Sequence, residues 1–370
     1  MKKSIHLVSF DNPYPPNYGG VIDVFYKIKK LHKLGVDIIL HINVFDTQNQ
    51  QPELEKYCKK IYYYKRKNNF LSLFSILPFR VKSRSNYQLT INLKSETIPI
   101  IFEGLHSIYP LLKFNFKDAY IRTHNIEHKY FFELSKSEKN IFKKALFYVE
   151  AIKLRRIETN LKRTKGIFTI SPIEQRYFLS KFGLKSKYIP AFHEAKKNNN
   201  LFSKGNFILY HGNLNVSENV TAAMFLIDVY KNSEFNLVIA GTFKNKLLLR
   251  EINKHDNIVY NPIPNQEELD KLFAQAHINI LITFQNTGIK LKLLNTLYKG
   301  KFIIANKFMV EKTGLEKLCK IANNKQEILA ETLNLFKKEF SSEEILEREL
   351  ILKEFNPETS AQKIIDIIFN

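Results

Sequence analysis

Short apolar runs alternate with helical patterns twice along this 370-residue chain, and this alternation constrains the fold more than any other feature. The first example fills residues 1–42. An apolar run to Phe10 is followed by a Pro- and Gly-rich loop, a helical pattern over 21–34, Gly35 and a second apolar run over 36–42. A strand, a helix and a second parallel strand make one βαβ unit. The sequence therefore predicts an α/β fold with doubly wound, mainly parallel sheets.

The same alternation continues in both halves of the chain. Further strands are predicted at 98–102, 119–123, 167–170, 206–210, 235–240, 257–260, 278–282 and 301–305. Periodicity is lost between Ala191 and Asn206, so we expect a domain boundary there. The predicted division is an N-terminal domain at 1–192, a C-terminal domain at 204–354 and a terminal helix at 355–370.

Several helices can be located from their apolar stripes and capping residues. A long helix before residue 166 carries one stripe of apolar residues, namely Phe147, Ala151, Leu154, Ile157 and Leu161. Ser171 and Glu174 form a capping box that opens the next helix. Terminal helices are expected over 326–354 and 359–369, with Pro357 breaking them apart.

The net charge of +21 is unevenly distributed. Residues 1–200 contain 36 Lys and Arg against 16 Asp and Glu, whereas residues 201–370 contain 21 against 20. Either the first half faces an anionic partner, or the Lys excess reflects codon usage in an AT-rich genome. No nucleic-acid recognition motif is present and Lys outnumbers Arg, so no nucleic acid is expected as a partner.

Residues 64–84 set apolar side chains between two basic clusters. This pattern fits an interfacial segment on anionic lipid, or equally a core helix with solvated flanks. No apolar run approaches the ~18–20 residues of a transmembrane helix. Cys58 and Cys319 lie far apart without nearby His partners, so neither a disulfide framework nor a zinc site is expected. The expected location is cytoplasmic, with peripheral attachment to the inner face of the cytoplasmic membrane as an option.

Common catalytic signatures are missing from the sequence. There is no G-x-G-x-x-G and no P-loop, which argues against dinucleotide oxidoreductases and P-loop NTPases. There is also no Asp-x-Asp to hold a nucleotide-bound metal and no G-x-S-x-G elbow. Hydrolases and metal-dependent transferases are therefore disfavoured, and we expect neither a metal nor a cofactor.

In the first half, candidate site residues follow the predicted strands. Gly19 and Gly20 open a helix, where backbone N–H groups can approach an anion, although an ordinary turn would look the same. His124 follows the strand at 119–123 and is placed to hydrogen-bond a substrate. His106 follows the strand at 98–102, where a purely structural role is the simpler interpretation.

The residues around His124 include a pattern that resembles a metal-binding motif. His124, Glu127 and His128 match the H-x-x-E-H motif of inverted zinc peptidases, which requires both His on one helical face. Because His124 ends a strand, we expect the match to be accidental. Arg122 and Glu127, together with His106, are candidates for the acceptor side of a cleft.

The second half repeats the arrangement of a strand, a glycine turn and a helix. Backbone groups at Gly212 and Asn213 could hold a phosphate, although Asn-rich turns are also common without ligands. Residues 287–297 open a helix after the strand at 278–282. Lys292, in its first turn beside free N–H groups, is a candidate pyrophosphate ligand, or else a solvated helical lysine.

In their order and spacing these motifs resemble the GT-B glycosyltransferases, specifically glycosyltransferase family 4 and its bacterial cell-surface polysaccharide, mannosyltransferase-like branch. The resemblance spans almost the whole chain. It implies two Rossmann-like domains facing a central cleft, with the sugar nucleotide bound mainly by the C-terminal domain and the acceptor by the N-terminal one. It also implies a terminal helix that crosses back to the N-terminal domain.

The resemblance assigns roles to individual positions. Gly19 and Gly20 would approach the donor phosphates and acceptor, and His124 would lie near the transferring sugar as the catalytic residue. Donor and phosphate binding would fall to Gly19, Gly20, Gly212, Asn213, Thr287, Gly288, Lys292 and Asn295. The E-x7-E pair of the family falls on Thr287 and Asn295, so neither Glu is present, and the usual Arg/Lys pair after residue 211 is also missing.

The function implied is transfer of a hexose from a sugar nucleotide to a lipid-linked or polysaccharide acceptor. The family mechanism retains the anomeric configuration without a metal, with the donor phosphate helping to deprotonate the acceptor. The basic N-terminal domain would then face anionic lipid or a phosphorylated acceptor. The missing residues leave a second hypothesis open, a catalytically weak GT-B-like binding or scaffold subunit of a polysaccharide assembly system.

Overall fold

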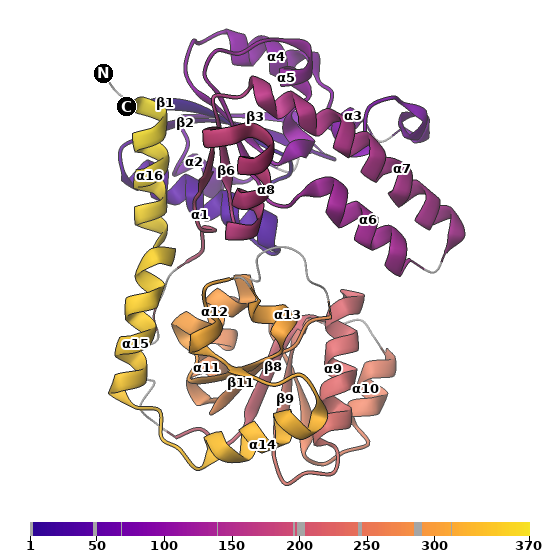
Figure 1. The fold of residues 1–370 in the computed structure, drawn as a ribbon, viewed down its shortest axis with the longest axis vertical. Coiled ribbons are helices and arrows are strands. Elements are labelled where there is room, and N and C mark those ends of the chain that lie inside the picture. The colour runs from indigo at the N-terminus through magenta and orange to yellow at the C-terminus, as the bar shows by residue number, and fades with distance from the viewer. Residues whose placement is uncertain are drawn as a thin grey trace. The chain divides into compact units, whose positions relative to one another are not determined.

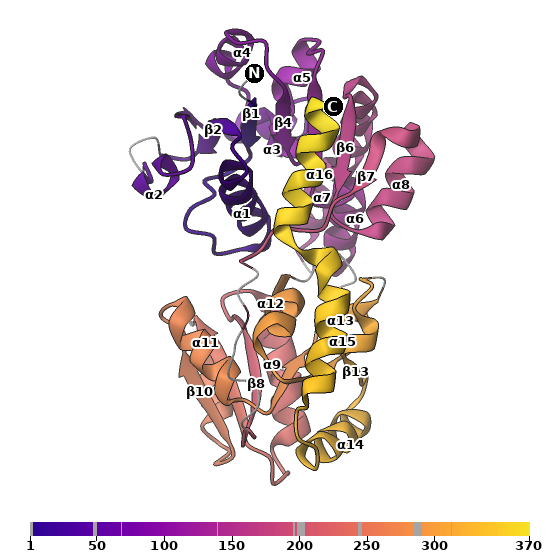
Figure 2. The ribbon, with the colours of Figure 1, turned by 90° about the vertical axis from the view of Figure 1, so that its left-hand side faces the viewer.

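The computed structural model describes residues 3–46, 50–67, 69–138, 140–194, 197, 204–242, 246–284, 291–311 and 313–370. The chain divides into two compact units. Unit 1 contains the described residues up to His193 together with Glu354–Asn370, and unit 2 contains those from Glu194 to Lys353. In each unit helices cover both faces of a sheet (Figures 1 and 2).

The sheet of unit 1 is parallel, with the strand order β3-β2-β1-β4-β5-β6-β7 over the residues described. Its strands are β1 (Ser4–Ser9), β2 (Asp37–Val44), β3 (Lys60–Lys65), β4 (Ile100–Glu103), β5 (Ala119–Thr123), β6 (Gly166–Thr169) and β7 (Ser186–Tyr188). The central strands β1, β4, β5 and β6 are buried almost throughout, as expected for a sheet covered on both faces. The order reverses beside β1, so the carboxyl ends of β1 and β4 flank a topological switch point.

The helices of unit 1 follow from amphipathic patterns and caps. They are α1 (Gly19–Lys33), α2 (Pro52–Glu55), α3 (Phe79–Lys82), α4 (Tyr87–Lys94), α5 (Tyr109–Lys113), α6 (Glu127–Ser137), α7 (Ile141–Glu158) and α8 (Pro172–Phe182). In α7 the predicted stripe is confirmed, because Ala151, Leu154 and Ile157 are buried. Helix α8 begins as predicted, with the Ser171 side chain accepting a hydrogen bond from Glu174 N.

The last helix, α16 (Pro357–Phe369), belongs to unit 1, as the predicted return to the N-terminal domain requires. It packs against α1, and Ile364 and Ile365 join the same hydrophobic cluster as Val24 and Ile28. Glu358 in its first turn binds Lys30 and Lys33 of α1, although such exposed ion pairs contribute little. Apolar burial therefore holds α16 in place.

Unit 2 is a second parallel sheet, with the order β10-β9-β8-β11-β12-β13 in the part of the chain described. Its strands are β8 (Ile208–Asn213), β9 (Leu237–Thr242), β10 (Ile258–Pro262), β11 (Ile278–Leu281), β12 (Phe302–Ala305) and β13 (Lys320–Ile321). Its helices are α9 (Ser217–Tyr230), α10 (Lys246–Ile252), α11 (Gln266–Gln275), α12 (Leu291–Lys299), α13 (Lys307–Val310), α14 (Lys325–Phe336) and α15 (Ser342–Leu352). The order again reverses, here beside β8.

One sequence prediction is wrong in detail, and for residues 64–84 the alternative of a core helix is excluded. The single helix expected over 326–354 is two helices, α14 and α15, because Ser341 and Glu344 form a complete capping box that starts a new helix. Residues 64–84 are not one helix either. They contain the end of β3, a short 3₁₀ helix and the one-turn helix α3.

Both units are doubly wound α/β sheets, and together with the returning α16 they make the GT-B architecture that the sequence predicts. Among the residues described, no helix combines the length and apolar character needed to cross a membrane. In parallel sheets of this kind, ligands bind outside the carboxyl ends of the strands. We therefore look for function at those two edges.

Candidate active site

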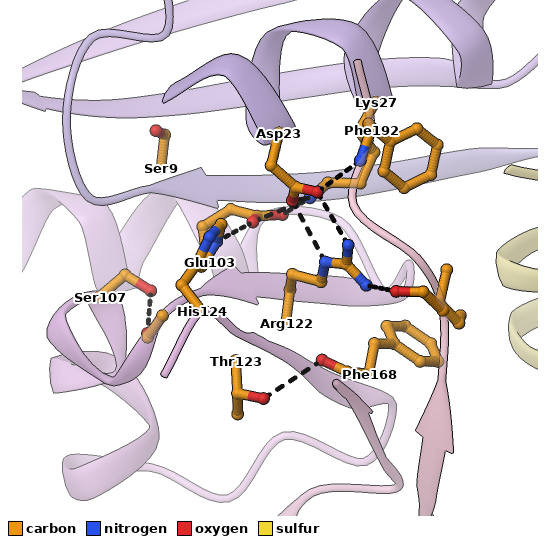
Figure 3. Close-up of polar contacts among 12 residues, drawn as sticks. Ser9, Asp23, Lys27, Glu103, Ser107, Arg122, Thr123, His124, Phe168 and Phe192 are labelled. Carbon is orange, nitrogen blue, oxygen red and sulfur yellow. Dashed lines mark hydrogen bonds and ion pairs between the residues drawn. The ribbon is translucent and has the colours of Figure 1, made fainter. Parts of the chain in front are cut away.

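A buried ionic network lies at the carboxyl ends of β4 and β5 in unit 1 (Figure 3). His124 follows β5, and its Nε2 lies 3.1 Å from Oε2 of Glu103, the last residue of β4. Glu103 is fully buried and also binds the equally buried Lys27 Nζ, at 2.8 Å from Oε1. Because a carboxylate only accepts hydrogen bonds, neutral His124 carries its hydrogen on Nε2 and keeps Nδ1 as an acceptor.

Asp23 of α1 joins this network from the other side. Lys27 Nζ lies 3.1 Å from its Oδ2, and Arg122 Nη2 lies 2.8 Å from its Oδ1. Burial would raise the pKa of Asp23, but the Arg122 guanidinium and the Lys27 ammonium hold it below its usual range. Arg122 also donates to the carbonyls of Ile189 and Pro190. The sequence predicts that Arg122 contacts an acceptor. In the structure Arg122 is instead fully buried and holds Asp23 in place.

Asp23, Glu103 and His124 each offer one ligand atom within 4.8 Å of the others, which is the spacing of a metal site. The chemistry of the donor set points elsewhere. Lys27 and Arg122 already balance the two carboxylates, and the Lys27 ammonium contacts both. The group is therefore a neutralised ion network that holds a histidine.

The H-x-x-E-H pattern does not form one site. His124 binds Glu103, Glu127 lies 3.3 Å from His106, and His128 Nδ1 lies 3.0 Å from Glu158. The three side chains therefore have three different partners. This agrees with the sequence interpretation that the match is accidental.

Phe10, just after β1, brings the surrounding loops together. Its ring centroid lies 5.4 Å from that of His124 and 6.3 Å from that of His106. A Cβ at Gly20 would lie 2.8 Å from the Phe10 ring, so the close approach of α1 requires glycine there. The neighbouring Gly19 is the exposed first residue of α1.

His106 and Glu127 form a second pair beside His124. Burial lowers the pKa of His106, and the approach of Glu127 only partly opposes this. Burial would raise the pKa of Glu127, but His106 holds it below its usual range. Both candidates for the acceptor side therefore lie at the edge where His124 lies.

Three arginines that the sequence interpretation did not select gather at this edge. Arg84 is buried, donating from Nε to Phe10 O at 2.6 Å and from Nη1 to Arg80 O at 2.7 Å. Burial, together with the nearby Arg66 and Arg80 charges, lowers the pKa of Arg84 to about 9, with Asp11 opposing. The Arg66 guanidinium lies over the Phe45 ring at 4.0 Å. An edge with this much positive charge suits an anionic substrate.

Glu174, in the first turn of α8, is a further buried carboxyl group in this unit. Burial raises its pKa to about 8, and a hydrogen bond from Ile170 N at 3.3 Å offsets this only in part. Glu174 is therefore mostly protonated at neutral pH. The sequence suggested only a capping role for it.

In unit 2 the turn at the corresponding edge is formed by backbone and neutral groups. The strand pair β8 and β9 brings Gly212 beside Gly241, where a Cβ on Gly241 would lie 2.0 Å from Gly212 O. Asn213 Oδ1 accepts from Asn215 N at 3.0 Å. Asn219 Nδ2 donates to Asn213 O at 2.9 Å. The predicted phosphate turn is thus a tight turn held by its own amide groups.

His211, at the end of β8, lies next to the predicted phosphate lysine. Its Nε2 lies 3.1 Å from Thr296 Oγ1, and that hydroxyl donates its single hydrogen to Lys292 O at 2.7 Å. Nε2 of His211 must therefore be the donor. Burial lowers the pKa of His211 to about 3, and the Lys292 charge contributes, so this histidine is neutral. The Lys292 ammonium lies 5.1 Å from the Tyr210 ring centroid.

Other polar groups at this edge had no signal in the sequence. Glu218 Oε1 accepts a short hydrogen bond from Thr283 Oγ1, and Asn306 bonds the backbone of Thr283 in both directions. A pocket of about 650 Å³ opens beside the start of α9. It is lined by Leu214, Asn215, Ser217, Val220, Thr221, Lys246 and Leu247.

The remaining predicted donor residues are divided by the described ranges. Asn295 is half-buried on α12, the helix that carries Lys292. Thr287 and Gly288 lie outside the described residues. Unit 2 thus has Gly212, Asn213 and Lys292 at its carboxyl edge, with Asn295 on the helix of Lys292, whereas unit 1 brings together Gly20, His106, His124 and Glu127.

Comparison with solved structures identifies the class of fold. The chain superposes over 99% of its length on 98% of sucrose-phosphate synthase from Thermosynechococcus elongatus, at 14% identity and a TM-score of 0.67. The chain superposes over its full length on 99% of TarM, at 12% identity and a TM-score of 0.69. It also superposes over 98% of its length on 98% of Anabaena HepE, which was solved with UDP and glucose, at 12% identity and a TM-score of 0.64. The fold is that of the GT-B glycosyltransferases.

At the level of sequence, no protein-family model matches the chain. A relative from Klebsiella pneumoniae is 29% identical over 330 residues, which is 84% of each chain. It is described as an uncharacterized 44.6 kDa protein in the cps region.

Proposed function

We propose that this protein is a metal-independent glycosyltransferase that transfers a hexose from a sugar nucleotide to a lipid-linked or polysaccharide acceptor. The observation that carries the proposal is His124, fixed by the buried Glu103 at the carboxyl edge of unit 1 with Nδ1 left as an acceptor. A histidine oriented by a buried carboxylate is suited to bind or deprotonate a sugar hydroxyl. The arginines beside it favour an acceptor that carries phosphate.

The donor would be bound by unit 2. The Gly212 turn lets an anion approach the backbone closely, and Lys292 supplies a positive charge nearby. Asn295 would bind a ribose hydroxyl, and Thr287 would contact the sugar. The neutral His211 supports this assignment, because its uncharged ring can hydrogen-bond a donor without adding a fixed charge.

The comparisons support this assignment at the level of fold. HepE was solved with UDP and glucose, and a TarM variant with UDP. The cps-region relative supports a role in cell-surface polysaccharide synthesis. We place the chain in the family 4-like, mannosyltransferase-like branch as part of the same proposal, with a cytoplasmic site of action.

The proposed mechanism retains the anomeric configuration. The donor phosphate would help to deprotonate the acceptor, and His124 would hold the transferring sugar. Helix N-termini and Lys292 would stabilise the departing diphosphate as its charge develops. Most of the rate enhancement would then come from positioning and electrostatics.

A second candidate function is a binding or scaffold subunit with little catalysis. It is favoured by the absence of both carboxylates of the E-x7-E pair, whose positions hold Thr287 and Asn295. Calorimetry with nucleoside diphosphates discriminates between the two, because a protein without a donor site would show no binding.

The test is release of nucleoside diphosphate from a panel of sugar nucleotides, with membrane lipid extract or polysaccharide as acceptor. We expect turnover with one donor in the presence of a chelator, and His124→Ala should lower kcat by about 10²–10³-fold. The anomeric configuration of the product, measured by NMR, tests retention.

His255→Ala is the matched control, since His255 lies in unit 2 next to Glu251, before β10 and so at the amino end of that strand. Glu103→Gln should shift the pH profile of kcat, because it removes the charge that orients His124 while keeping its volume. Absence of turnover with every donor, together with no detectable diphosphate binding, would replace the enzymatic proposal with the scaffold one.

A further inference from the structure

Helix α7 exposes an unusual amount of apolar surface. Six large apolar side chains on it are between 44% and 81% exposed: Ile141, Phe142, Leu146, Tyr148, Val149 and Ile152. Single exposed apolar residues are normal, but contiguous patches of them mark interaction sites.

The helical spacing places these side chains on the outer side of α7. Residues at i, i+4, i+7, i+8 and i+11 share one face of an α-helix, and here they are Ile141, Ala145, Tyr148, Val149 and Ile152. The opposite face carries Ala151 and Leu154, which are fully buried. That inner face packs on α6, with which α7 forms a helical hairpin (Figure 1). Tyr148 at the margin of the outer face contacts Phe132 of α6, at 5.5 Å between ring centroids, but the side chains of that face stay at least 44% exposed.

The segment before α3 extends this surface. Phe74 and Ile76 are 76% and 75% exposed. The segment is fastened to α7, because Lys153 Nζ donates to Leu73 O at 2.9 Å and Glu150 accepts from Phe79 N at 2.8 Å. We call the combined surface the apolar ridge. It consists of Phe74, Ile76, Ile141, Phe142, Leu146, Tyr148, Val149 and Ile152.

The charges around the apolar ridge are mainly positive, although Glu138 lies just before α7 and accepts a hydrogen bond from Asn140 N. Helix α7 carries Lys143, Lys144, Lys153, Arg155 and Arg156. Its two acidic residues are buried, and Glu158 is bound to His128, Tyr177 and Lys181. Residues 65–84 contain six Lys and Arg and no Asp or Glu. The ridge therefore combines apolar side chains with a net positive charge.

We propose that the apolar ridge docks unit 1 on an anionic lipid surface. Apolar side chains would enter the boundary between headgroups and acyl chains, while the flanking Lys and Arg bind lipid phosphates. A second copy of the chain fits less well, because a two-fold interface would bring two positively charged ridges together. The charge complementarity selects the membrane.

This proposal is independent of catalysis, since a protein without transferase activity would still bind lipid. It does give the proposed function a physical basis. An enzyme held at the membrane surface meets a lipid-linked acceptor in two dimensions, at a high effective concentration.

The test uses co-sedimentation of the full chain with vesicles of phosphatidylcholine, with or without phosphatidylglycerol. We expect binding only to the anionic vesicles, weakening as salt is added. The double variant Ile141→Ser/Phe142→Ser should lower the partition coefficient by at least about tenfold. Arg155→Gln/Arg156→Gln should lower it by roughly 30-fold.

Matched controls keep the result specific. Leu184→Ser and Leu346→Ser remove equally exposed apolar residues elsewhere and should leave binding unchanged. Diphosphate binding by the ridge variants should equal that of the parent protein, which separates this proposal from the proposed function. Three outcomes overturn the proposal: unaltered partition of both double variants, a lowered Tm that shows the ridge packs within the chain, or loss of a dimer on light scattering.

Discussion

The carboxyl edges of the two sheets occupy the same place in the same kind of fold but use different chemistry. In unit 1, buried charges of both signs hold His124, through Glu103, Lys27, Asp23 and Arg122. In unit 2, the edge is made mostly of glycine backbone, amides and the neutral His211, with Lys292 and Glu218 as charged groups. The comparison teaches that the fully buried charges of Asp23, Lys27, Glu103 and Arg122 occur where ion pairs are completed inside the domain.

The largest expected effect is on the stability of unit 1. Arg122→Met leaves Asp23 with one buried cation, Lys27, beside the hydrogen bond from Phe192 N, which should lower the free energy of unfolding by about 3–5 kcal/mol. Denaturant unfolding measures it, and the exposed Arg176→Met should cost below about 0.5 kcal/mol. Equal losses for the two variants would mean that the ion network does not stabilise this edge.

The next effect concerns Glu174 and pH. Its folded pKa of about 8 lies above that of the unfolded chain, so the folded state keeps the proton and stability falls as pH rises from about 4.5 to 8. Glu174→Gln removes this loss, so its free energy of unfolding at pH 8 should exceed that of the parent by on the order of 3 kcal/mol. Unfolding curves at several pH values check this.

Glu133→Gln, an exposed carboxylate on α6, is the control and should leave the pH dependence of unfolding unaltered. A Glu174→Gln protein with the same pH dependence as the parent would show that Glu174 is ionised in the folded state.

In unit 2 the corresponding sensitivity is steric. A Cβ at Gly241 meets a carbonyl oxygen of the neighbouring strand, so Gly241→Ala should cost roughly 2 kcal/mol and weaken nucleoside diphosphate binding. At Gly212 the Cβ would instead meet the movable Asn219 side chain, at 3.2 Å. Gly212→Ala should therefore lower the free energy of unfolding by less than Gly241→Ala does, as measured by denaturant unfolding. A larger loss for Gly212→Ala would contradict the structure.

The smallest effect is expected at Lys292. Lys292→Met should weaken nucleoside diphosphate binding roughly tenfold in calorimetry, by removing a charge near the bound diphosphate. It should also raise the pKa of His211, because the Lys292 charge helps to lower it, although burial still keeps the ring neutral. NMR titration of His211 checks this shift. The exposed Lys254→Met is the control, and a similar change there would show that only net charge matters.

The sequence was sufficient for the architecture. Strand and helix periodicity, Gly35 after α1, the Ser171 cap and Pro357 are local signals, and each occurs where predicted. The short strands β3, β7 and β13 were missed, because their few residues carry no clear periodicity. A local signal also explains the error at α14 and α15, where the Ser341 capping box was present in the sequence but overlooked.

The candidate site could be predicted only in part. His124, Gly20 and Lys292 were found because they follow strands, where ligands of such sheets bind. Glu103 and His106 share a strand and its following loop, but nothing local pairs Glu103 with His124 or His106 with Glu127. Arg66, Arg80 and Arg84 lie within residues 64–84, for which the sequence allows either an interfacial segment on lipid or a core helix.

By itself the sequence determined two α/β units, the returning terminal helix and an excess of positive charge in the first half. Tertiary structure alone decided how that charge is used. Lys27 and Arg122 form ion pairs with buried carboxylates. Arg66, Arg80 and Arg84 lie together at the candidate site. Arg155 and Arg156 flank the apolar ridge. The physical reason is that the energy of a charge depends on its burial and its neighbours, which residues distant in sequence supply.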